Sequence, residues 1–245
     1  MIWLYDGEWD GLLSAVFQVF ARKDEEAVIQ SRDAFEGLSL FPVQTVATNP
    51  EHAARVGRGM ARLSGELPKT AYRAFLSEQP ERERALLGTL RLGFAHDRNP
   101  LPLLQEEPVG KLCALARRVT NEQRLFLGVT RLLHVGGDLY AADIQPETHI
   151  LPLMGHHFHR RFNDQRLLIR DVGRLSALVS TPEEWWITRL PVDEALPPLP
   201  RDAEMTALWR SYFKAVANPA RENLKLQQQY VPLKYRGNIT EFQWE

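Results

Sequence analysis

The hydrophobic periodicity of the chain changes near residue 129, and this change restricts the fold more than any other feature of the sequence. Before it, apolar residues recur at helical spacing; the clearest case is the stripe of Trp9, Leu12, Leu13, Val16, Phe17 and Phe20. After it, short apolar runs alternate with turn residues, and Gly136-Gly137 separates two such runs as in a tight hairpin. The pattern predicts an α+β fold with a helical N-terminal half.

The elements follow from the same spacing. In the first half we expect strands over 1–5 and near 42–46, a helix beginning near Trp9, and helices over 50–63, 68–78, 81–96 and 109–127. In the second half we expect strands over 129–135, 139–144, 166–171, 175–180 and 184–190, with a helix over 149–162. This ββαβββ order predicts an antiparallel sheet packed with the helical half. Beyond a proline-rich linker at 191–200, helices are expected over 205–216 and 219–229.

The prolines at positions 100, 102 and 108 predict a loop over 97–108, which is the best domain boundary in the sequence. We therefore expect a mostly helical region over 1–100 and an α+β region with basic C-terminal helices over 101–245. One continuous domain remains an alternative, because the chain of 245 residues is within the size of a single large domain.

Composition excludes several classes of protein. The hydrophobic fraction of 44% is enough for a folded core, and no apolar run reaches the roughly 18 residues of a membrane helix. The single cysteine, Cys113, excludes internal disulfides and zinc motifs with several cysteines. The N-terminus resembles no secretory signal. We expect a soluble cytoplasmic protein without a membrane partner.

The net charge of −1 conceals an asymmetry between the two halves. Residues 1–110 carry 12 basic and 16 acidic side chains, whereas residues 111–245 carry 18 and 15. Most of the basic residues are arginine, whose planar fork suits phosphate. Basic residues interleaved with aromatics and amides are typical of nucleic-acid contacts. The predicted nucleic-acid contacts are Arg160, Arg161, Arg174, Arg221, Lys225, Lys234, Tyr235 and Arg236.

A structural role for the C-terminal run remains open, because Leu224, Leu226 and Tyr230 could dock a polar helix on the core. His156, His157 and His159 lie at spacings i, i+1 and i+3 without a carboxylate in their helix. This spacing does not match a helical metal motif, so we expect no metal and no cofactor. The same histidines would suit the carbonyls at a helix C-terminus or a phosphate.

Three residues are weak candidates for catalysis. Asp164 and Asp171 flank a predicted strand, and His157 precedes them; carboxylates of this kind hold Mg²⁺ in nucleases. Ion pairs with Arg161 and Arg174 are the commoner use of such acids. Whether the chain is an enzyme is left open by the sequence.

The chain also resembles a bacterial family labelled "probable DNA metabolism protein". The resemblance lies in Tyr5-Asp6-Gly7 with Gly11-Leu-Leu-Ser-Ala-Val16, in Arg91-Leu-Gly-Phe94, in His149-Ile-Leu-Pro-Leu153 with His157-Phe158, Arg161, Asp164-Gln165, Ile169, Asp171 and Arg174, and in the segment from Trp209 to Glu241. The C-terminal segment is the most specific of these. In that family, members look like companions of a radical S-adenosylmethionine (SAM) protein with DNA-binding character, and some are fused to a uracil-DNA-glycosylase-like domain.

The resemblance implies an accessory role in DNA repair or DNA modification, with single-stranded or damaged DNA and a radical SAM or uracil-DNA-glycosylase-type protein as partners. The alternative is a metal-dependent nuclease or glycosylase-like hydrolase acting on DNA. A third hypothesis is an interaction scaffold whose basic face docks the partner enzyme. The chain lacks the three-cysteine set of a radical SAM enzyme, so it is not that enzyme itself.

Overall fold

The computed structural model describes residues 1–191 and 222–239, together with positions 199, 207, 208, 211, 212, 215, 216 and 218. The chain groups into two compact units, Met1–Thr120 and Asn121–Glu245, which are taken separately below. The division falls inside helix α5 (Glu107–Val129), whereas the prolines place the sequence-based boundary in the preceding loop. That the regions 1–100 and 101–245 are separate domains stays a prediction.

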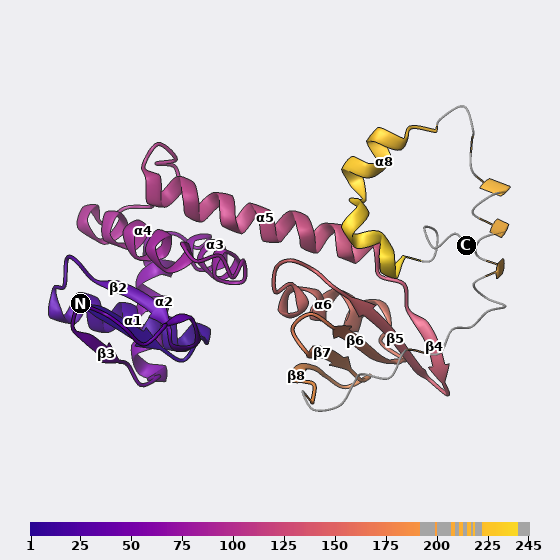
Figure 1. Ribbon diagram of the computed structural model, residues 1–245, viewed down its shortest axis with the longest axis horizontal. Helices are drawn as coiled ribbons and strands as arrows, with labels where there is room; N and C mark the ends of the chain where they lie inside the picture. The colour runs from indigo at the N-terminus through magenta and orange to yellow at the C-terminus, as the bar shows by residue number, and fades with distance from the viewer. Residues whose placement is uncertain are drawn as a thin grey trace. The chain divides into compact units, whose positions relative to one another are not determined.

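The N-terminal unit is built on a small parallel sheet with strand order β2-β1-β3 (Figure 1). Its strands are β1 (Ile2–Tyr5), β2 (Val28–Ser31) and β3 (Val43–Thr45), and a short 3-10 turn, Arg32–Ala34, follows β2. Helix α1 (Trp9–Arg22) connects β1 to β2, as a parallel pair requires. Strand β2 is not among the sequence-based expectations, because four residues with one buried apolar side chain give no readable period.

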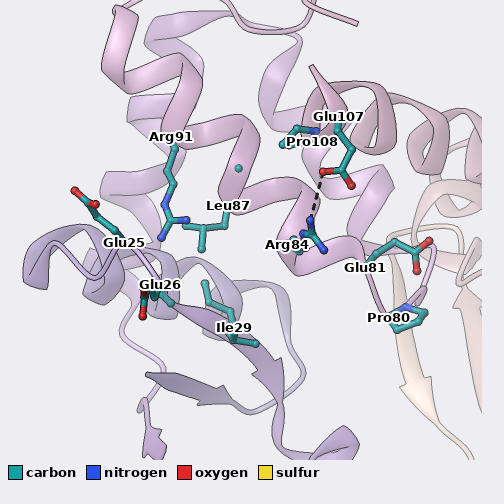
Figure 2. A pocket seen from close by; sticks show the side chains of 13 residues that line it. Glu25, Glu26, Ile29, Pro80, Glu81, Arg84, Leu87, Arg91, Glu107 and Pro108 are labelled. Atoms are coloured by element: carbon teal, nitrogen blue, oxygen red, sulfur yellow. Dashed lines mark hydrogen bonds and ion pairs between the residues drawn. The ribbon is translucent and has the colours of Figure 1, made fainter. Parts of the chain in front are cut away.

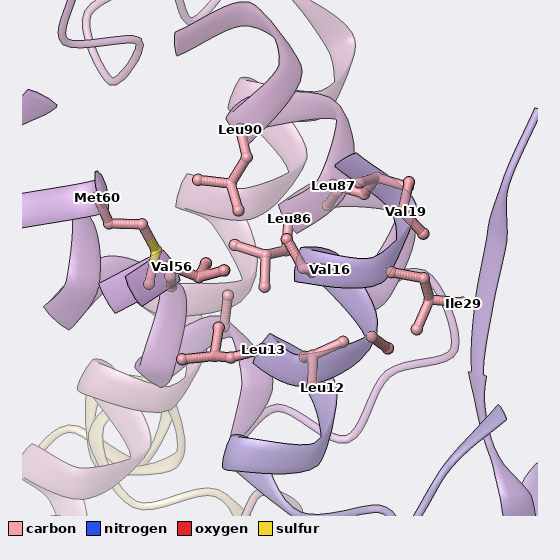
Figure 3. Packing of buried hydrophobic residues seen from close by; sticks show 14 of the residues in the cluster. Leu12, Leu13, Val16, Val19, Ile29, Val56, Met60, Leu86, Leu87 and Leu90 are labelled. Atoms are coloured by element: carbon pink, nitrogen blue, oxygen red, sulfur yellow. The ribbon is translucent and has the colours of Figure 1, made fainter. Parts of the chain in front are cut away.

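Four helices of this unit follow in sequence: α1, α2 (Pro50–Leu63), α3 (Leu67–Phe75) and α4 (Arg82–His96). Helices α1 and α4 pack on the strands, and α2 and α3 pack on the other helices. Figure 3 shows the core where α1, α2 and α4 meet: Leu13 and Val16 of α1 lie near Val56 of α2 and Leu86 of α4. Leu12 and Met60 belong to the same buried cluster. The apolar stripe in the sequence of α1 is therefore the buried face of that helix.

Helix α2 begins as its sequence predicts. The Asn49 side chain accepts hydrogen bonds from the backbone N–H groups of Glu51 and His52, and Pro50 occupies the first helical position. This is the usual stabilisation of a helix N-terminus.

The C-terminal unit contains a five-stranded sheet in the order β4-β5-β6-β7-β8 (Figure 1). The strands are β4 (Leu133–Gly136), β5 (Leu139–Ile144), β6 (Arg166–Asp171), β7 (Ser176–Ser180) and β8 (Trp185–Arg189). Helix α6 (Leu151–Arg161) lies between β5 and β6 in sequence, and packs on β7 and β8. The C-terminal segment adds α8 (Leu224–Tyr230) and a 3-10 helix, Leu233–Asn238.

The mixed α and β class is confirmed, and one detail of the sheet is corrected. The sequence-based expectation is a wholly antiparallel sheet, but β5 and β6 run parallel. The reason is α6, which carries the chain back across the sheet before β6 begins, so that β6 starts at the same edge as β5. The other three pairs are antiparallel, and β4 and β5 meet at the Gly136-Gly137 turn, where both glycines have positive φ.

Half of the helix predicted over 205–216 lies outside the described residues, and its described positions 207, 208, 211, 212, 215 and 216 are helical. Residues 219–221 of the helix expected over 219–229 also lie outside the described residues. Within the described part of the chain, no helix combines the length and the apolar content that spanning a membrane requires.

Candidate nucleic-acid interface

Helix α6 has one buried and one exposed face. Its buried residues recur at i, i+3, i+4 and i+7 and face the sheet; they are Leu151, Met154, Gly155 and Phe158. Gly155 lies so close to Trp185 of β8 that a Cβ at this position would be 2.3 Å from the indole ring. Only glycine therefore fits here. The close approach fixes α6 on the sheet and leaves the intervening positions of the helix directed to solvent.

The exposed positions of α6 carry four side chains that are cationic or can become so. His156, His157, Arg160 and Arg161 are all exposed and line a shallow hollow of about 360 Å³. We call these four residues the α6 basic face. The side chains lie in the last two turns of α6, where cations are also favoured by the helix dipole.

The α6 basic face stands apart from the acidic side chains of the described residues. Within the described residues, none of its four side chains forms an ion pair with a carboxylate. Its remaining contacts are with aromatic rings: the Arg161 guanidinium lies 5.9 Å from the Phe162 ring centroid, and His156 meets Trp185 edge to face at 5.1 Å. Among the residues that the structure describes, no carboxylate occupies the donors of Arg160 and Arg161, so these donors could bind an external anion.

His159 is separated from the other histidines of α6 by its direction. Its Nδ1 lies 3.0 Å from the hydroxyl of Ser180, a fully buried residue at the end of β7. His159 thus faces the sheet, while His156 and His157 face solvent. Across the described ranges, no group of three His, Cys, Asp or Glu side chains is placed to hold a metal ion.

A second polar cluster joins α5, the loop after β5 and the C-terminal 3-10 helix. At its centre is Glu122 of α5, whose side chain is buried. One carboxylate oxygen accepts hydrogen bonds from the Glu147 N–H at 2.7 Å and the Tyr235 hydroxyl at 2.5 Å. The other oxygen accepts from the Thr148 N–H at 2.8 Å and the Thr148 hydroxyl at 2.5 Å. Four donors on one carboxylate hold these three segments together.

Arg174 holds the same loop from the turn between β6 and β7. Its guanidinium donates to the carbonyl oxygens of Pro146 at 2.9 Å and Glu147 at 2.7 Å, and to Asp171 at 3.1 Å. Asp171 is fully buried and also accepts from the backbone N–H groups of Gly173 and Arg174. Burial raises the pKa of the Asp171 carboxyl above its ordinary value, and the charge of Arg174 opposes that shift. We call Glu122, Thr148, Asp171, Arg174 and Tyr235 the loop anchor.

Of the nucleic-acid contacts predicted in the C-terminal segment, three are bonded or packed within the protein and one is exposed. Lys234 pairs with Glu147 at 2.5 Å, the Tyr235 ring packs edge to face on Phe126, and Arg236 donates to the Val231 carbonyl at 3.0 Å. These side chains make internal contacts. Lys225 is exposed on α8, and Arg221 lies outside the described residues.

The three weak catalytic candidates do not converge. Asp164 precedes β6 and Asp171 ends it, so the length of the strand separates them by roughly 20 Å at about 3.3 Å per residue. Asp164 and His157 are exposed, whereas Asp171 is buried and bonded to the turn that it closes. The structure thus brings together Arg160, Arg161 and His157, and keeps both aspartates apart from each other.

Glu122 and Thr148 of the loop anchor, and Trp185 beside the α6 basic face, are missing from the sequence-based candidates. Glu122 falls on the apolar stripe of α5 with Leu115, Val119 and Phe126, and a charged residue within such a stripe is a readable sign of a buried carboxylate that needs donors. Trp185 gives no comparable sign, because its position beside His156 depends on the packing of β8 against α6.

No curated protein and no solved structure matches the chain. Residues 80–241 match a protein family, DUF4130, described as a domain of unknown function. The matched range covers more than half of the chain and includes both α6 and the loop anchor. The chain therefore belongs to the DUF4130 family.

Proposed function

We propose that this protein is an accessory factor of DNA repair or DNA modification that binds single-stranded or damaged DNA through the α6 basic face. The observation that carries the proposal is the hollow lined by His156, His157, Arg160 and Arg161, whose cations lack carboxylate partners in the described part of the chain. Exposed arginines without a carboxylate partner in the described residues suit phosphate oxygens, which take two parallel hydrogen bonds from one guanidinium.

The aromatic surroundings favour flexible over paired strands. The Trp185 ring meets His156 edge to face at 5.1 Å, and the Phe162 ring centroid lies 5.9 Å from the Arg161 guanidinium. Aromatic rings beside phosphate-binding cations allow unstacked bases to pack on the protein. This supports single-stranded or locally opened DNA as the ligand.

The proposed protein partner is a radical SAM or uracil-DNA-glycosylase-type protein, and the family resemblance supports it. Such a partner would supply the chemistry, and this chain would hold the DNA strand beside it. The hydrolase alternative has no comparable support, because His157, Asp164 and Asp171 are not gathered at one place.

The direct test is a fluorescence-anisotropy titration of a labelled single-stranded oligonucleotide, its duplex, and a duplex with an abasic site. Single-stranded and abasic DNA should bind more tightly than intact duplex. The double substitution Arg160→Gln with Arg161→Gln should weaken binding about tenfold at low salt, because two phosphate contacts are lost.

The matched control is Arg166→Gln, which removes an exposed arginine of the same unit that is already paired with Asp138 at 2.5 Å. This variant should bind as the wild type does. No binding by the wild-type protein at low salt, alone or with the partner, would overturn the proposal. Retention of the partner after nuclease treatment, without any DNA binding, would instead establish the basic face as a protein-docking surface.

A further inference from the structure

The N-terminal unit contains a groove that the proposed DNA interface does not use. Its volume is about 720 Å³, within the usual range of ligand sites (Figure 2). It is lined by the start of β2, by α4 and by the beginning of α5. We call it the β2 groove; its lining includes Glu25, Glu26, Ile29, Arg84, Leu87 and Arg91.

The groove has an apolar floor fixed by close packing. Figure 2 shows Ile29 of β2 and Leu87 of α4 facing each other across it. At one side, α4 meets Pro108 at Gly88, where a Cβ would lie 2.7 Å from the proline ring. Because there is no room for a side chain at Gly88, this wall consists of the α4 backbone packed on Pro108. Ile29 and Leu87 are already buried in the core, so the floor exists before any ligand binds.

One wall of the groove includes residues of β2, which is an edge strand among the strands that the structure describes. Strand β2 is at the end of its sheet, and among the described strands it pairs with β1 alone. Val28 donates its backbone N–H to the Met1 carbonyl, so the backbone groups of the next residue, Ile29, point to the opposite side. The Val28 side chain is 52% exposed. An edge of this kind can accept one more strand.

Some charged side chains around the groove form ion pairs or hydrogen bonds within the protein, and others form no ion pair in the described residues. Glu81 pairs with Lys111 at 2.6 Å, and Glu107 pairs with Arg84 at 3.4 Å. Arg91 donates to the carbonyl oxygen of Asp24 at 2.8 Å. Glu25 and Glu26 are exposed at the same end as Arg91, and their carboxylates form no ion pair within the described residues (Figure 2). The lining has four carboxylates against two guanidinium groups, so its excess charge is negative.

We propose that the β2 groove binds an extended, lysine- or arginine-containing segment of a partner protein, added to the sheet beside β2. Main-chain hydrogen bonds to Ile29 would align the segment, and a basic side chain would meet Glu25 and Glu26. The occupant is a peptide rather than a nucleic acid, because the excess charge of the described lining is negative.

The test uses the full-length protein and a labelled short peptide of alternating valine and lysine. The peptide should bind, and Glu25→Gln with Glu26→Gln should weaken it about fivefold, as expected for two exposed charge contacts. The control variant Glu36→Gln with Glu51→Gln changes the net charge equally but lies outside the groove, and should leave affinity unchanged. The same peptide with N-methylated backbone should bind at least tenfold more weakly, since it cannot form the added ladder.

Equal binding of the N-methylated peptide, or an equal loss in the two glutamate variants, would overturn the proposal, as would the absence of any binding. Peptide binding by the Arg160→Gln, Arg161→Gln protein should match that of the wild type. This measurement shows whether peptide binding by the β2 groove is independent of the proposed DNA interface in the other unit.

Discussion

Within the C-terminal unit, the α6 basic face and the loop anchor use the same residue type in opposite ways. Arg160 and Arg161 are exposed and lack carboxylate partners in the described chain, whereas Arg174 donates to two backbone carbonyls and a buried aspartate. A local excess of positive charge therefore does not by itself identify a binding surface. What distinguishes the two regions is whether the donors of each cation are already occupied.

This difference assigns separate roles. The loop anchor should determine how stable the unit is, and the α6 basic face should determine what it binds. Substitutions in one region should leave the property of the other unchanged, apart from the fraction of molecules that is folded.

The largest effect is expected from Glu122→Gln. The amide would present an NH₂ group to donors that now share a carboxylate, leaving buried N–H and hydroxyl groups unsatisfied. The free energy of unfolding should fall by about 3 kcal/mol, measured by urea denaturation. The exposed control Glu183→Gln should change it by less than about 0.5 kcal/mol. Equal stability of Glu122→Gln and wild type would show that the anchor does not stabilise the unit.

A smaller loss is expected from Arg174→Gln. The substitution removes hydrogen bonds to the Pro146 and Glu147 carbonyls and leaves the buried Asp171 without its cation. Because the Arg174 side chain is partly exposed, solvent moderates the loss to about 2 kcal/mol. Denaturation measures this loss, and DNA titration of the folded protein should give unchanged affinity. Reduced affinity at full stability would move Arg174 into the interface.

The smallest effect concerns the pH dependence of stability. Burial raises the pKa of Asp171, so the folded state holds this proton to higher pH than the unfolded chain does. The stability that this group contributes is present below its unfolded pKa and is lost as the pH rises through its folded pKa. Asp171→Asn does not titrate, so the wild type should lose stability relative to this variant as the pH rises above about 4, the ordinary pKa of an aspartate. Denaturation curves across this range check the sign; a relative gain by the wild type would mean that Arg174 outweighs burial.

The sequence was sufficient for features that depend on local period. The helix containing His157 and Arg160 is predictable because its buried residues repeat at helical spacing, which directs the charged ones outward. The Asn49-Pro50 start of α2 is predictable for the same local reason. These features need no knowledge of distant parts of the chain.

The remaining features depend on distant partners. The sequence alone does not distinguish the bonded Arg174 from the exposed Arg161. The carbonyl groups that accept hydrogen bonds from Arg174 belong to residues 27 and 28 positions earlier in the chain. The parallel pairing of β5 and β6 depends on where α6 returns the chain. The open edge of β2 depends on the strand order of its sheet, and no local pattern reports that order.

The central claim is that Arg160 and Arg161, which have no carboxylate partner in the described residues, bind DNA, whereas Arg174, which is bonded within the protein, does not. The salt dependence of DNA binding tests this claim most directly. The slope of log affinity against log salt concentration should become shallower in the Arg160→Gln, Arg161→Gln protein. The expected change is about 1 for each of the two phosphate contacts that are lost. In Arg174→Gln, measured where the protein is folded, the slope should equal that of the wild type. An unchanged slope in the double variant together with a shallower slope in Arg174→Gln would contradict the account.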